Sequence, residues 1–308
     1  MPVVDFNSFP TLLDERYREI EQMLLASEID MIPDMYTVRD SDRRQERKGS
    51  VGEFGAWPEF SGELSYDRIY EQYNVLTTHR EYAVGMRITQ RMLEDDLSGV
   101  WDGDMFDPMA RSGIYTRQQH ATRVLQFATS NDQTFYVRSE GVALASNSHT
   151  TRTPSVSTTT GFDNLGTAAL SPTTYRANRI QMRQFRNDRA QIANIIADEL
   201  WVPIDLEPRA QEILYSDRHP DSAENRINPE SAARQPTQIK VSIHWTDTND
   251  WALMNSVLRK RNQVWWERIK PQYRTIGDFD TFQVKVGGRG RWGTMVLDWR
   301  QMMFASVG

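Results

Sequence analysis

The stretch from Asp107 to Ser130 constrains the fold more than any other part of the sequence. Asp107 can accept a hydrogen bond from the free amides of a first helical turn, and Pro108 suits the first helical position because its missing N–H is not needed there. Helical periodicity places the apolar residues of the stretch on one side and its polar residues on the other. The stretch therefore predicts one amphipathic helix of roughly 36 Å, at about 1.5 Å per residue.

Two polar residues, Arg117 and Gln118, interrupt the middle of this apolar stripe. A helix sunk in one round core would keep its stripe unbroken, because long polar side chains are rarely buried without a partner. We therefore expect the helix to lie across an open surface or between subunits.

Composition limits what surrounds this helix. The 308 residues leave room for one large domain or two ordinary ones, but only 39% of them are hydrophobic, which is low for a compact globule. The formal net charge of -6 indicates that any contact with nucleic acid must be local. The absence of cysteine removes disulfides and thiolate sites and favours a reducing compartment.

The first residues do not suggest a standard export signal, and no part of the sequence suggests a membrane span. Residues 1–10 have no basic region followed by an apolar run, and no segment approaches about 18 uninterrupted apolar residues. We expect a protein that does not span a membrane. Residues 9–26 predict an N-terminal amphipathic helix.

A dense mixed-charge run, from Arg39 to Gly49, contains no apolar residue. The stretch that follows it bears the aromatic residues Phe54, Trp57 and Phe60 between glycines and a proline. Two aromatic-bearing segments around a charged tip predict a long hairpin or extended loop. Such a loop cannot fill the core of its own domain, so its aromatic residues must be buried elsewhere.

The remaining pattern predicts a mixed α+β chain without repeats. The expected strands are residues 73–88, 192–202, 238–245 and 263–269, with hairpins at 134–145 and, at the C-terminus, between 281–286 and 294–305. The other expected helices are residues 89–97, 171–188, 251–258 and one that begins at Pro208.

The sequence Gly288–Gly293 matches the dinucleotide fingerprint G-x-G-x-x-G. That fingerprint works between a strand and a helix, whereas here another strand is expected to follow. We therefore predict a glycine-rich hairpin turn that exposes Arg289 and Arg291, with no bound nucleotide or other cofactor.

No motif predicts catalysis. The carboxylates from Glu94 to Asp107 match no calcium loop, the five histidines contain no pair at i,i+4 spacing, and no serine lies in a nucleophile elbow. We expect no catalytic residue and no metal site. A metal-dependent nucleic-acid enzyme that uses the Glu94–Asp107 carboxylates remains an alternative.

Several short motifs, in this order along the chain, resemble the major capsid proteins of tailed bacteriophages, particularly the Mu-like major head subunits. They are Glu140–His149, Asn164–Gly166, Leu170–Pro172, Val202–Pro203, Asp278–Thr281 and Asp298–Arg300. The resemblance extends over roughly residues 54–305.

The resemblance implies the Hong Kong 97-like fold, with a long spine helix, an extended β-hairpin loop, and peripheral and axial domains. It divides the chain into an N-terminal arm (1–33), an extended loop (34–80), a peripheral domain (81–169, with the spine helix at 107–130), an axial domain (170–280) and a C-terminal hairpin returning to the peripheral domain (281–308). An encapsulin-like compartment shell is the alternative within this fold.

The implied function is that of a non-enzymatic virion protein. Subunits would assemble in the host cytoplasm into hexamers and pentamers of an icosahedral shell, with scaffolding, portal and cement proteins as further partners and non-specific contact with packaged double-stranded DNA. We expect the contacts between subunits to involve the extended loop, through Arg43, Arg44, Arg47, Lys48, Phe54, Trp57 and Phe60. The loop's cations would meet acidic residues near Glu94–Asp96 of a neighbour, and its aromatic residues that neighbour's spine-helix region.

Overall fold

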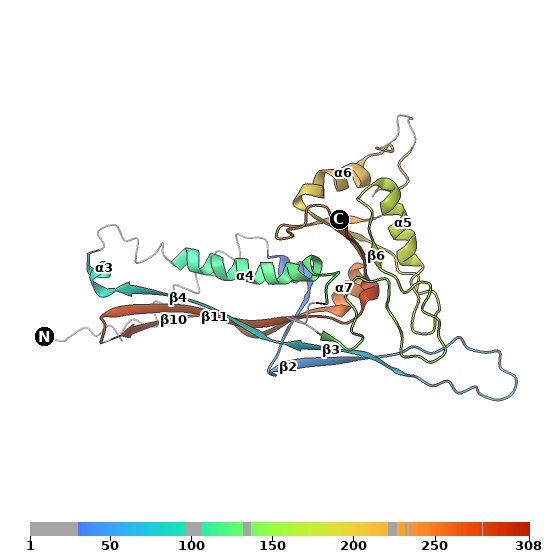
Figure 1. Cartoon of the computed structure of the whole chain (residues 1–308), viewed down its shortest axis with the longest axis horizontal. Helices are drawn as coiled ribbons and strands as arrows, with labels where there is room; N and C mark the ends of the chain where they lie inside the picture. The colour runs from blue at the N-terminus through green and yellow to red at the C-terminus, as the bar shows by residue number, and fades with distance from the viewer. Residues whose placement is uncertain are drawn as a thin grey trace.

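The computed structural model describes residues 30–95, 106–131, 137–220, 227–231, 233, 236–278 and 280–308. The expected N-terminal helix (9–26) and most of the proposed arm lie outside the described residues. Figure 1 shows an elongated molecule: a helix and a long sheet form a flat part, a wedge of helices and strands stands over one end of it, and a loop projects beyond the wedge.

The flat part contains a four-stranded sheet in the order β1-β10-β11-β4. Its strands are β1 (Thr37–Asp40), β10 (Gln263–Asp278), β11 (Gln283–Val296) and β4 (Arg80–Thr89). β10, β11 and β4 are antiparallel, and β1 pairs in parallel with β10. A short helix, α3 (Gln90–Glu94), follows β4, and the Thr89 side chain caps it, as expected, by accepting a hydrogen bond from the Met92 amide.

The predicted long helix is α4 (Phe106–Gln126), which runs along one face of this sheet (Figure 1). It begins and ends before the predicted bounds of Asp107 and Ser130, because the backbone leaves the helix in a turn after Gln126. Its second half buries Ala121, Val124 and Leu125 in the main hydrophobic core.

Arg117, which interrupts the apolar stripe of α4, has a partner within the same chain. Arg117 forms an ion pair with Glu267 of β10, and both side chains are nearly buried. The Arg117 guanidinium lies 5.8 Å from the ring centre of Trp265 and 5.9 Å from that of Trp292. The polar break therefore packs, as a paired cation, on buried aromatic rings of its own sheet, while the helix itself lies across the face of that sheet and not inside one round core.

The wedge contains a five-stranded sheet in the order β6-β12-β9-β7-β8. Its strands are β6 (Leu165–Gly166), β12 (Met302–Ala305), β9 (Trp251–Met254), β7 (Glu199–Pro203) and β8 (Gln238–Ser242). The associated helices are α5 (Pro172–Arg183), α6 (Glu207–Tyr215) and α7 (Ser256–Asn262), with short helical turns at Ile204–Leu206 and Trp299–Gln301. Strand β9 replaces the helix expected over 251–258, because Trp251–Met254 is wholly buried and pairs on both edges.

A three-stranded sheet, β2-β3-β5, forms the base of the projecting loop. It consists of β2 (Gln45–Val51), β3 (Glu71–Thr78) and β5 (Val137–Arg138). The strand predicted over 73–88 is in fact two strands, β3 and β4, which belong to different sheets and are separated at His79. The described part of the predicted 134–145 hairpin is also different, since β5 pairs with β3 and not with 142–145.

The predicted C-terminal hairpin does not form. β11 runs unbroken through Gly288–Gly293 and pairs with β10 and β4, while β12 joins the sheet of the wedge. The two strands expected to pair with each other therefore lie in different sheets. The sheets do not follow the predicted segments. In the four-stranded sheet, β10 from segment 170–280 lies beside β11 from segment 281–308, and in the five-stranded sheet β9 from segment 170–280 lies beside β12 from segment 281–308.

The main core joins the wedge to the flat part. It combines the second half of α4, the strands of the wedge sheet and the short helix α2 (Met31–Met35). Met31, Ile32 and Met35 are buried in this core, so the described end of the proposed arm packs on its own chain.

Candidate functional site

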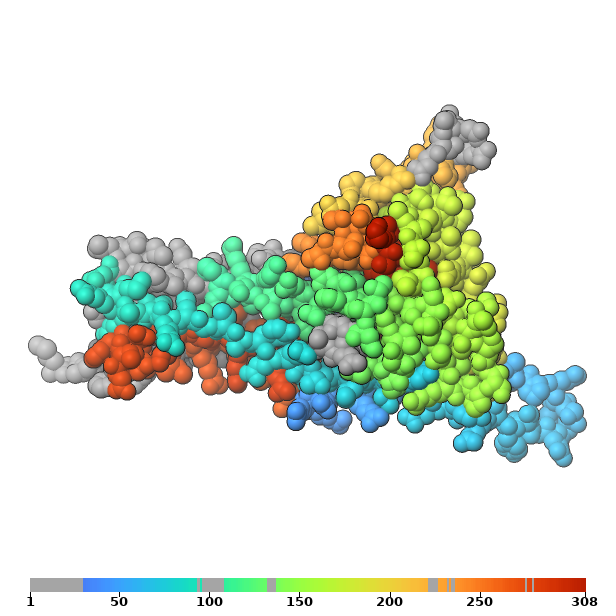
Figure 2. All heavy atoms as spheres, in the orientation of Figure 1, coloured from blue at the N-terminus to red at the C-terminus, as the bar shows by residue number. Residues whose placement is uncertain are grey.

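The outer part of the proposed extended loop (34–80) is residues 52–70, which connect β2 and β3 and extend furthest from the body of the molecule. From here on, "the loop" means these residues. Figure 2 shows it projecting past the wedge at one end of the long axis. The two strands at its base are antiparallel and pair from Gln45 with Thr78 to Val51 with Glu71. At the start of the loop, the Gly52 amide donates to the Tyr70 carbonyl at 2.9 Å, which closes the base.

Large apolar side chains on this loop face solvent. Trp57 is 95% exposed and Tyr66 is 92% exposed, values close to those of an unfolded chain. The other members of the group are Phe54, Phe60 and Leu64, and Ile69 near the base of the loop is also exposed. Exposed aromatic residues gathered on one segment are typical of interaction surfaces, because their burial in a partner stabilises a complex.

Arg189, in the turn after α5, holds the base of the loop in place. It donates to the Glu53 carbonyl at 3.2 Å, to Asp67 Oδ1 at 2.8 Å and to the Arg68 carbonyl at 2.5 Å. A second side chain from the same turn, Asn187, donates from Nδ2 to Glu53 Oε2 at 2.5 Å. The wedge thus fixes the direction of the loop, and the apolar residues beyond this clasp remain exposed.

Asp67 also ties the two arms of the loop to each other. Its carboxylate accepts from the Gly55 amide at 2.8 Å, and this hydrogen bond, with that from the Arg68 amide and the nearby Arg189, holds the pKa of Asp67 below its usual value. The charged form of Asp67 is therefore the one that fits the loop base.

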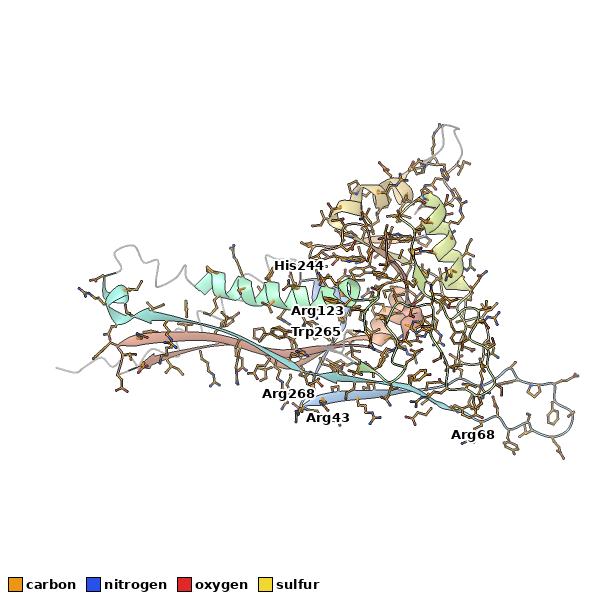
Figure 3. The ribbon with its side chains drawn as sticks, viewed as in Figure 1. Arg43, Arg68, Arg123, His244, Trp265 and Arg268 are labelled. Carbon is orange, nitrogen blue, oxygen red and sulfur yellow. The ribbon has the colours of Figure 1, made fainter. Side chains whose placement is uncertain are left out.

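The charged run does not form the tip of the loop, contrary to the sequence prediction. Arg43 and Arg44 lie in the turn between β1 and β2, and Arg47 lies on β2. Figure 3 places Arg43 and Arg68 at opposite ends of the β2–β3 hairpin. The run contributes through its backbone, which forms β1 and β2, and its four arginines stay exposed.

Lys48 lies apart from both groups. It is exposed on β2, and its ammonium is 5.8 Å from the ring centre of Trp266 in its own chain. Of the seven residues expected to contact a neighbouring subunit, the structure thus brings Phe54, Trp57 and Phe60 together at the loop tip and leaves the four cations nearer the sheet.

The expected acidic partners of those cations are only partly described. Asp95 is exposed and lies 3.9 Å from Arg91 of the same short helix. The side chain of Glu94, the whole of Asp96 and most of the Glu94–Asp107 carboxylate group fall outside the described residues and side chains. Within the part of the chain that is described, no group of three or more His, Cys, Asp or Glu residues could hold a metal ion.

A buried group of charges lies where the β2–β3–β5 sheet meets the wedge. Arg138 on β5 is 3.1 Å from Glu140, and Glu140 is 3.2 Å from Nδ1 of His149. The His149 ring stacks on Trp299, with ring centres 4.3 Å apart. Burial alone would raise the pKa of Glu140, but hydrogen bonds from His149 and the Thr150 amide and the charge of Arg138 lower it below the usual value.

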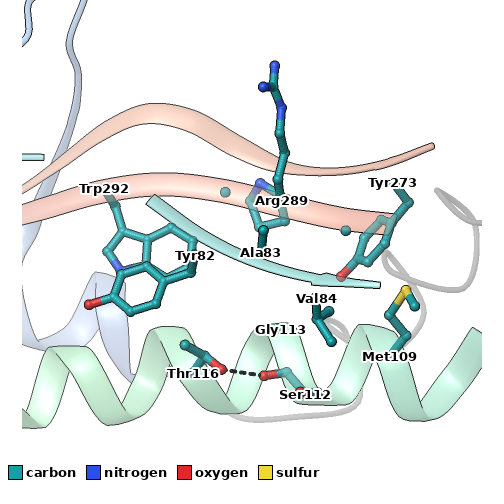
Figure 4. Close-up of a pocket in the computed structure, with 13 residues that line it drawn as sticks. Tyr82, Ala83, Val84, Met109, Ser112, Gly113, Thr116, Tyr273, Arg289 and Trp292 are labelled. Carbon is teal, nitrogen blue, oxygen red and sulfur yellow. Dashed lines mark hydrogen bonds between the residues drawn. The ribbon is translucent and has the colours of Figure 1, made fainter. Parts of the chain in front are cut away.

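A cavity of about 140 Å³ lies between α4 and the long sheet. Figure 4 shows Tyr82, Tyr273 and Trp292 around it, with Met109 and Gly113 on the helix side and Arg289 pointing away from the helix. The Gly288–Gly293 motif, which was predicted to form a hairpin turn, is part of strand β11 and contributes the strand side of this cavity. Gly288 and Gly290 have ordinary extended backbone there, not the positive φ expected for a turn.

The clasp residues Arg189 and Asn187 escaped the sequence analysis. Each contacts residues more than 120 positions away, and no local pattern around them indicates a long-range role. Further, no helix in the described ranges has the length and apolarity needed to cross a membrane.

Comparison with known proteins adds independent information. A family model described as "Phage capsid protein" matches residues 72–303 of the chain. A search of curated protein sequences finds no relative.

Several solved structures are similar to this chain at low identity. The bacteriophage JBD30 capsid protein has a TM-score of 0.55 at 15% identity, covering 73% of this chain and 94% of that one. The capsid of a native GTA particle has a TM-score of 0.53 at 12% identity, covering 91% of this chain and 90% of that one. The JBD30 procapsid has a TM-score of 0.50 at 14% identity, covering 98% of this chain and 76% of that one.

Proposed function

The chain belongs to the phage capsid protein family, and from that premise we propose that it is the major head subunit of a tailed bacteriophage. Its fold is the α+β Hong Kong 97-like capsid fold that the sequence resemblance implied. Copies of the chain would form hexamers and pentamers of an icosahedral shell that encloses double-stranded DNA. The family and the fold support a structural role and not an enzymatic one.

The extended loop is the observation that best supports this proposal. Five large apolar side chains project from residues 54–66, a segment that the wedge holds away from the body. A monomer gains nothing from holding such a segment in water, because exposed aromatic surface is unfavourable. A neighbouring subunit would bury it, and Phe54, Trp57 and Phe60 would then be central contacts.

The shape of the molecule supports assembly into rings. The loop and the far end of the long sheet lie at opposite ends of the long axis (Figure 1). A contact between two different surfaces is head-to-tail, and it generates a closed ring when the rotation between copies closes. Rings of five and six copies are the units that we propose.

A role as the major head subunit also implies further protein partners and a location. Scaffolding, portal and cement proteins would act during assembly in the host cytoplasm, and the finished protein would reside in the virion. With a formal net charge of -6, contact with packaged DNA would be local and non-specific. We also retain the division into arm (1–33), extended loop (34–80), peripheral domain (81–169), axial domain (170–280) and C-terminal segment (281–308) as a proposal.

The test is to replace residues 54–66 by a short Gly-Ser linker, which leaves β2, β3 and the Arg189 clasp intact. We expect a folded subunit with a cooperative thermal transition that no longer forms closed particles by sedimentation or electron microscopy. A second variant keeps the loop length but changes Phe54, Trp57 and Phe60 to serine, and it should fail in the same way because the apolar contact is lost.

Two outcomes would count against this role of the loop. Normal shells from both variants would show that the loop tip is dispensable for assembly. Unfolding of the shortened protein would show that the loop serves its own subunit.

A further inference from the structure

Among the described residues, a helix covers one face of the long sheet and the other face is open. α4 packs against the face that bears Trp292, while residues at alternate positions of β11 point the other way. Four of the residues on this second face are exposed cations: Arg87, Arg274, Lys285 and Arg289. Among the described residues, no helix covers them.

Two glycines lie side by side in the middle of the open face. Gly85 on β4 is directly opposite Gly287 on β11. A Cβ at Gly85 would find its nearest neighbour in the Val286 carbonyl oxygen at 3.4 Å, and a Cβ at Gly287 would find the Val84 carbonyl oxygen at 3.7 Å. Only backbone lies beside these positions, so the two glycines form a floor without side chains.

The four cations surround this floor. In the same cross-strand row, Arg274 of β10 lies opposite Gly287. Arg289 lies two residues along β11 in one direction, and Lys285 lies two residues along in the other, opposite Arg87. The floor is therefore bounded on three sides by cations and open at β4, the edge strand. We call these six residues the cationic seat.

The carboxylates near the seat do not balance its charge. Glu81 is 3.9 Å from Arg289, and Asp278 is 2.5 Å from Lys285. Arg87 and Arg274 form no ion pair with any described residue. The seat therefore has an excess of positive charge, which favours an acidic occupant.

The tip of the extended loop has the complementary chemistry. Asp67 is held by Arg189 and Glu53 by Asn187, but Glu59 and Glu63 are exposed and have no partner among the described residues. These two carboxylates alternate with the exposed aromatic residues. Aromatic rings can lie flat on a glycine floor and stack with arginine, while the carboxylates pair with the surrounding cations.

We propose that the cationic seat of one subunit receives the loop tip, residues 54–66, of a neighbouring copy. This inference rests on the proposed function and specifies the surface that the loop contacts. The contact must join two copies, because tip and seat lie at opposite ends of one molecule (Figure 1). It differs from a contact with the spine-helix region, which lies on the other face of the sheet.

The first test is charge reversal with rescue. The face variant carries Arg87→Glu and Arg274→Glu, and the tip variant carries Glu59→Arg and Glu63→Arg. Each should raise the subunit concentration needed for shell formation by about tenfold, because attractive pairs become repulsive. The combined variant, with all four changes, should assemble at close to the parent concentration.

A control places a single Arg-to-Glu reversal on the other side of the sheet, to be compared with Arg87→Glu alone as well as with the double face variant. Arg111 is exposed on α4, and Arg111→Glu should leave assembly unchanged. If Arg111→Glu impairs assembly and the face variant does not, the loop contacts the helix side and the seat proposal is wrong. Normal shells from the face variant that retain less DNA would instead assign the seat to the packaged nucleic acid.

The second test uses the absence of cysteine from the chain. A variant with Ser61→Cys in the tip and Ala83→Cys beside the seat has only these two thiols. Assembled shells treated with a short bismaleimide should give a ladder of covalent oligomers on a denaturing gel. The Ser61→Cys, Ser112→Cys variant, with its second thiol on α4, should give none.

The two proposals fail in distinguishable ways. Shells that cross-link only through Ser112→Cys would refute the seat and leave the loop as an inter-subunit element. Shells in which neither pair cross-links, together with normal assembly of the loop-shortened variant, would refute both proposals.

Discussion

At Gly290 the missing side chain makes room for the Trp292 ring. A Cβ at this position would lie 2.4 Å from the Cζ3 atom of Trp292, a distance that no real contact tolerates. The ring also stacks on Tyr82, with centres 4.8 Å apart, so it cannot move freely. The glycine is therefore required by packing against α4 and not by a turn.

Gly290→Ala should destabilise the subunit by about 1–3 kcal/mol, because overpacking forces the Trp292 ring and its neighbours to shift. Thermal or urea unfolding of the variant measures this loss. Gly277→Ala is the matched control, since nothing lies within 4 Å of the added Cβ there. Equal stability of the two variants, or saturable nucleotide binding that Gly290→Ala removes, would contradict this account of the motif.

The lowered pKa of Glu140 predicts how the stability of the folded protein depends on pH. Its pKa is below the usual value in the folded protein, so its contribution is fully present above the unfolded pKa of about 4.3 and is lost as the pH falls through the lower folded value. Glu140→Gln should be less stable than the parent at neutral pH and should lose less stability below about pH 4.3. Glu63→Gln, in the exposed loop, should keep the parent's slope, and an unchanged slope in Glu140→Gln would contradict the assignment.

At the scale of elements, the Arg117–Glu267 pair joins α4 to β10. Arg117→Met leaves a nearly buried carboxylate without its cation, so unfolding free energy should fall by about 3–5 kcal/mol. The double variant Arg117→Met, Glu267→Gln should recover part of this loss, because no uncompensated charge remains. Urea denaturation of the two variants measures the difference, and a single variant within about 0.5 kcal/mol of the parent would mean that the pair does not hold the helix to the sheet.

The sequence correctly predicted those elements whose positions depend on contacts between residues close together in the chain. Pro108 and the apolar stripe identified α4 to within a few residues. The expected starts of two other helices, at Thr89 and Ser171, are confirmed, because the side chains of these residues bond to amides in the next turn. The aromatic residues of the extended loop were correctly expected to lie outside the core of their own domain, since glycines and a proline separate them.

Long-range pairing explains most of the errors. The alternation over 73–88 gives no sign that the chain passes from one sheet to another at His79. Trp251–Met254 looks helical alone, but two neighbouring strands hold it extended. The seat is likewise invisible in sequence, because register alone brings Arg87, Lys285 and Arg274 together from three strands.

At the scale of the whole molecule, elongation and charge favour a subunit that is completed by its neighbours. One end presents an apolar, acidic tip and the other an open cationic sheet face. Each contact of this kind is weak alone, but it repeats around every ring and across the shell, so small free energies accumulate. Weak individual contacts also allow misplaced subunits to dissociate.

The central claim is that many copies of this chain close into a shell, and the size of the purified full-length protein tests it most directly. Sedimentation velocity with electron microscopy, over a series of protein and salt concentrations, should reveal closed particles of megadalton mass built from five- and six-membered rings. Monomers and small open oligomers at every concentration and ionic strength would contradict the account.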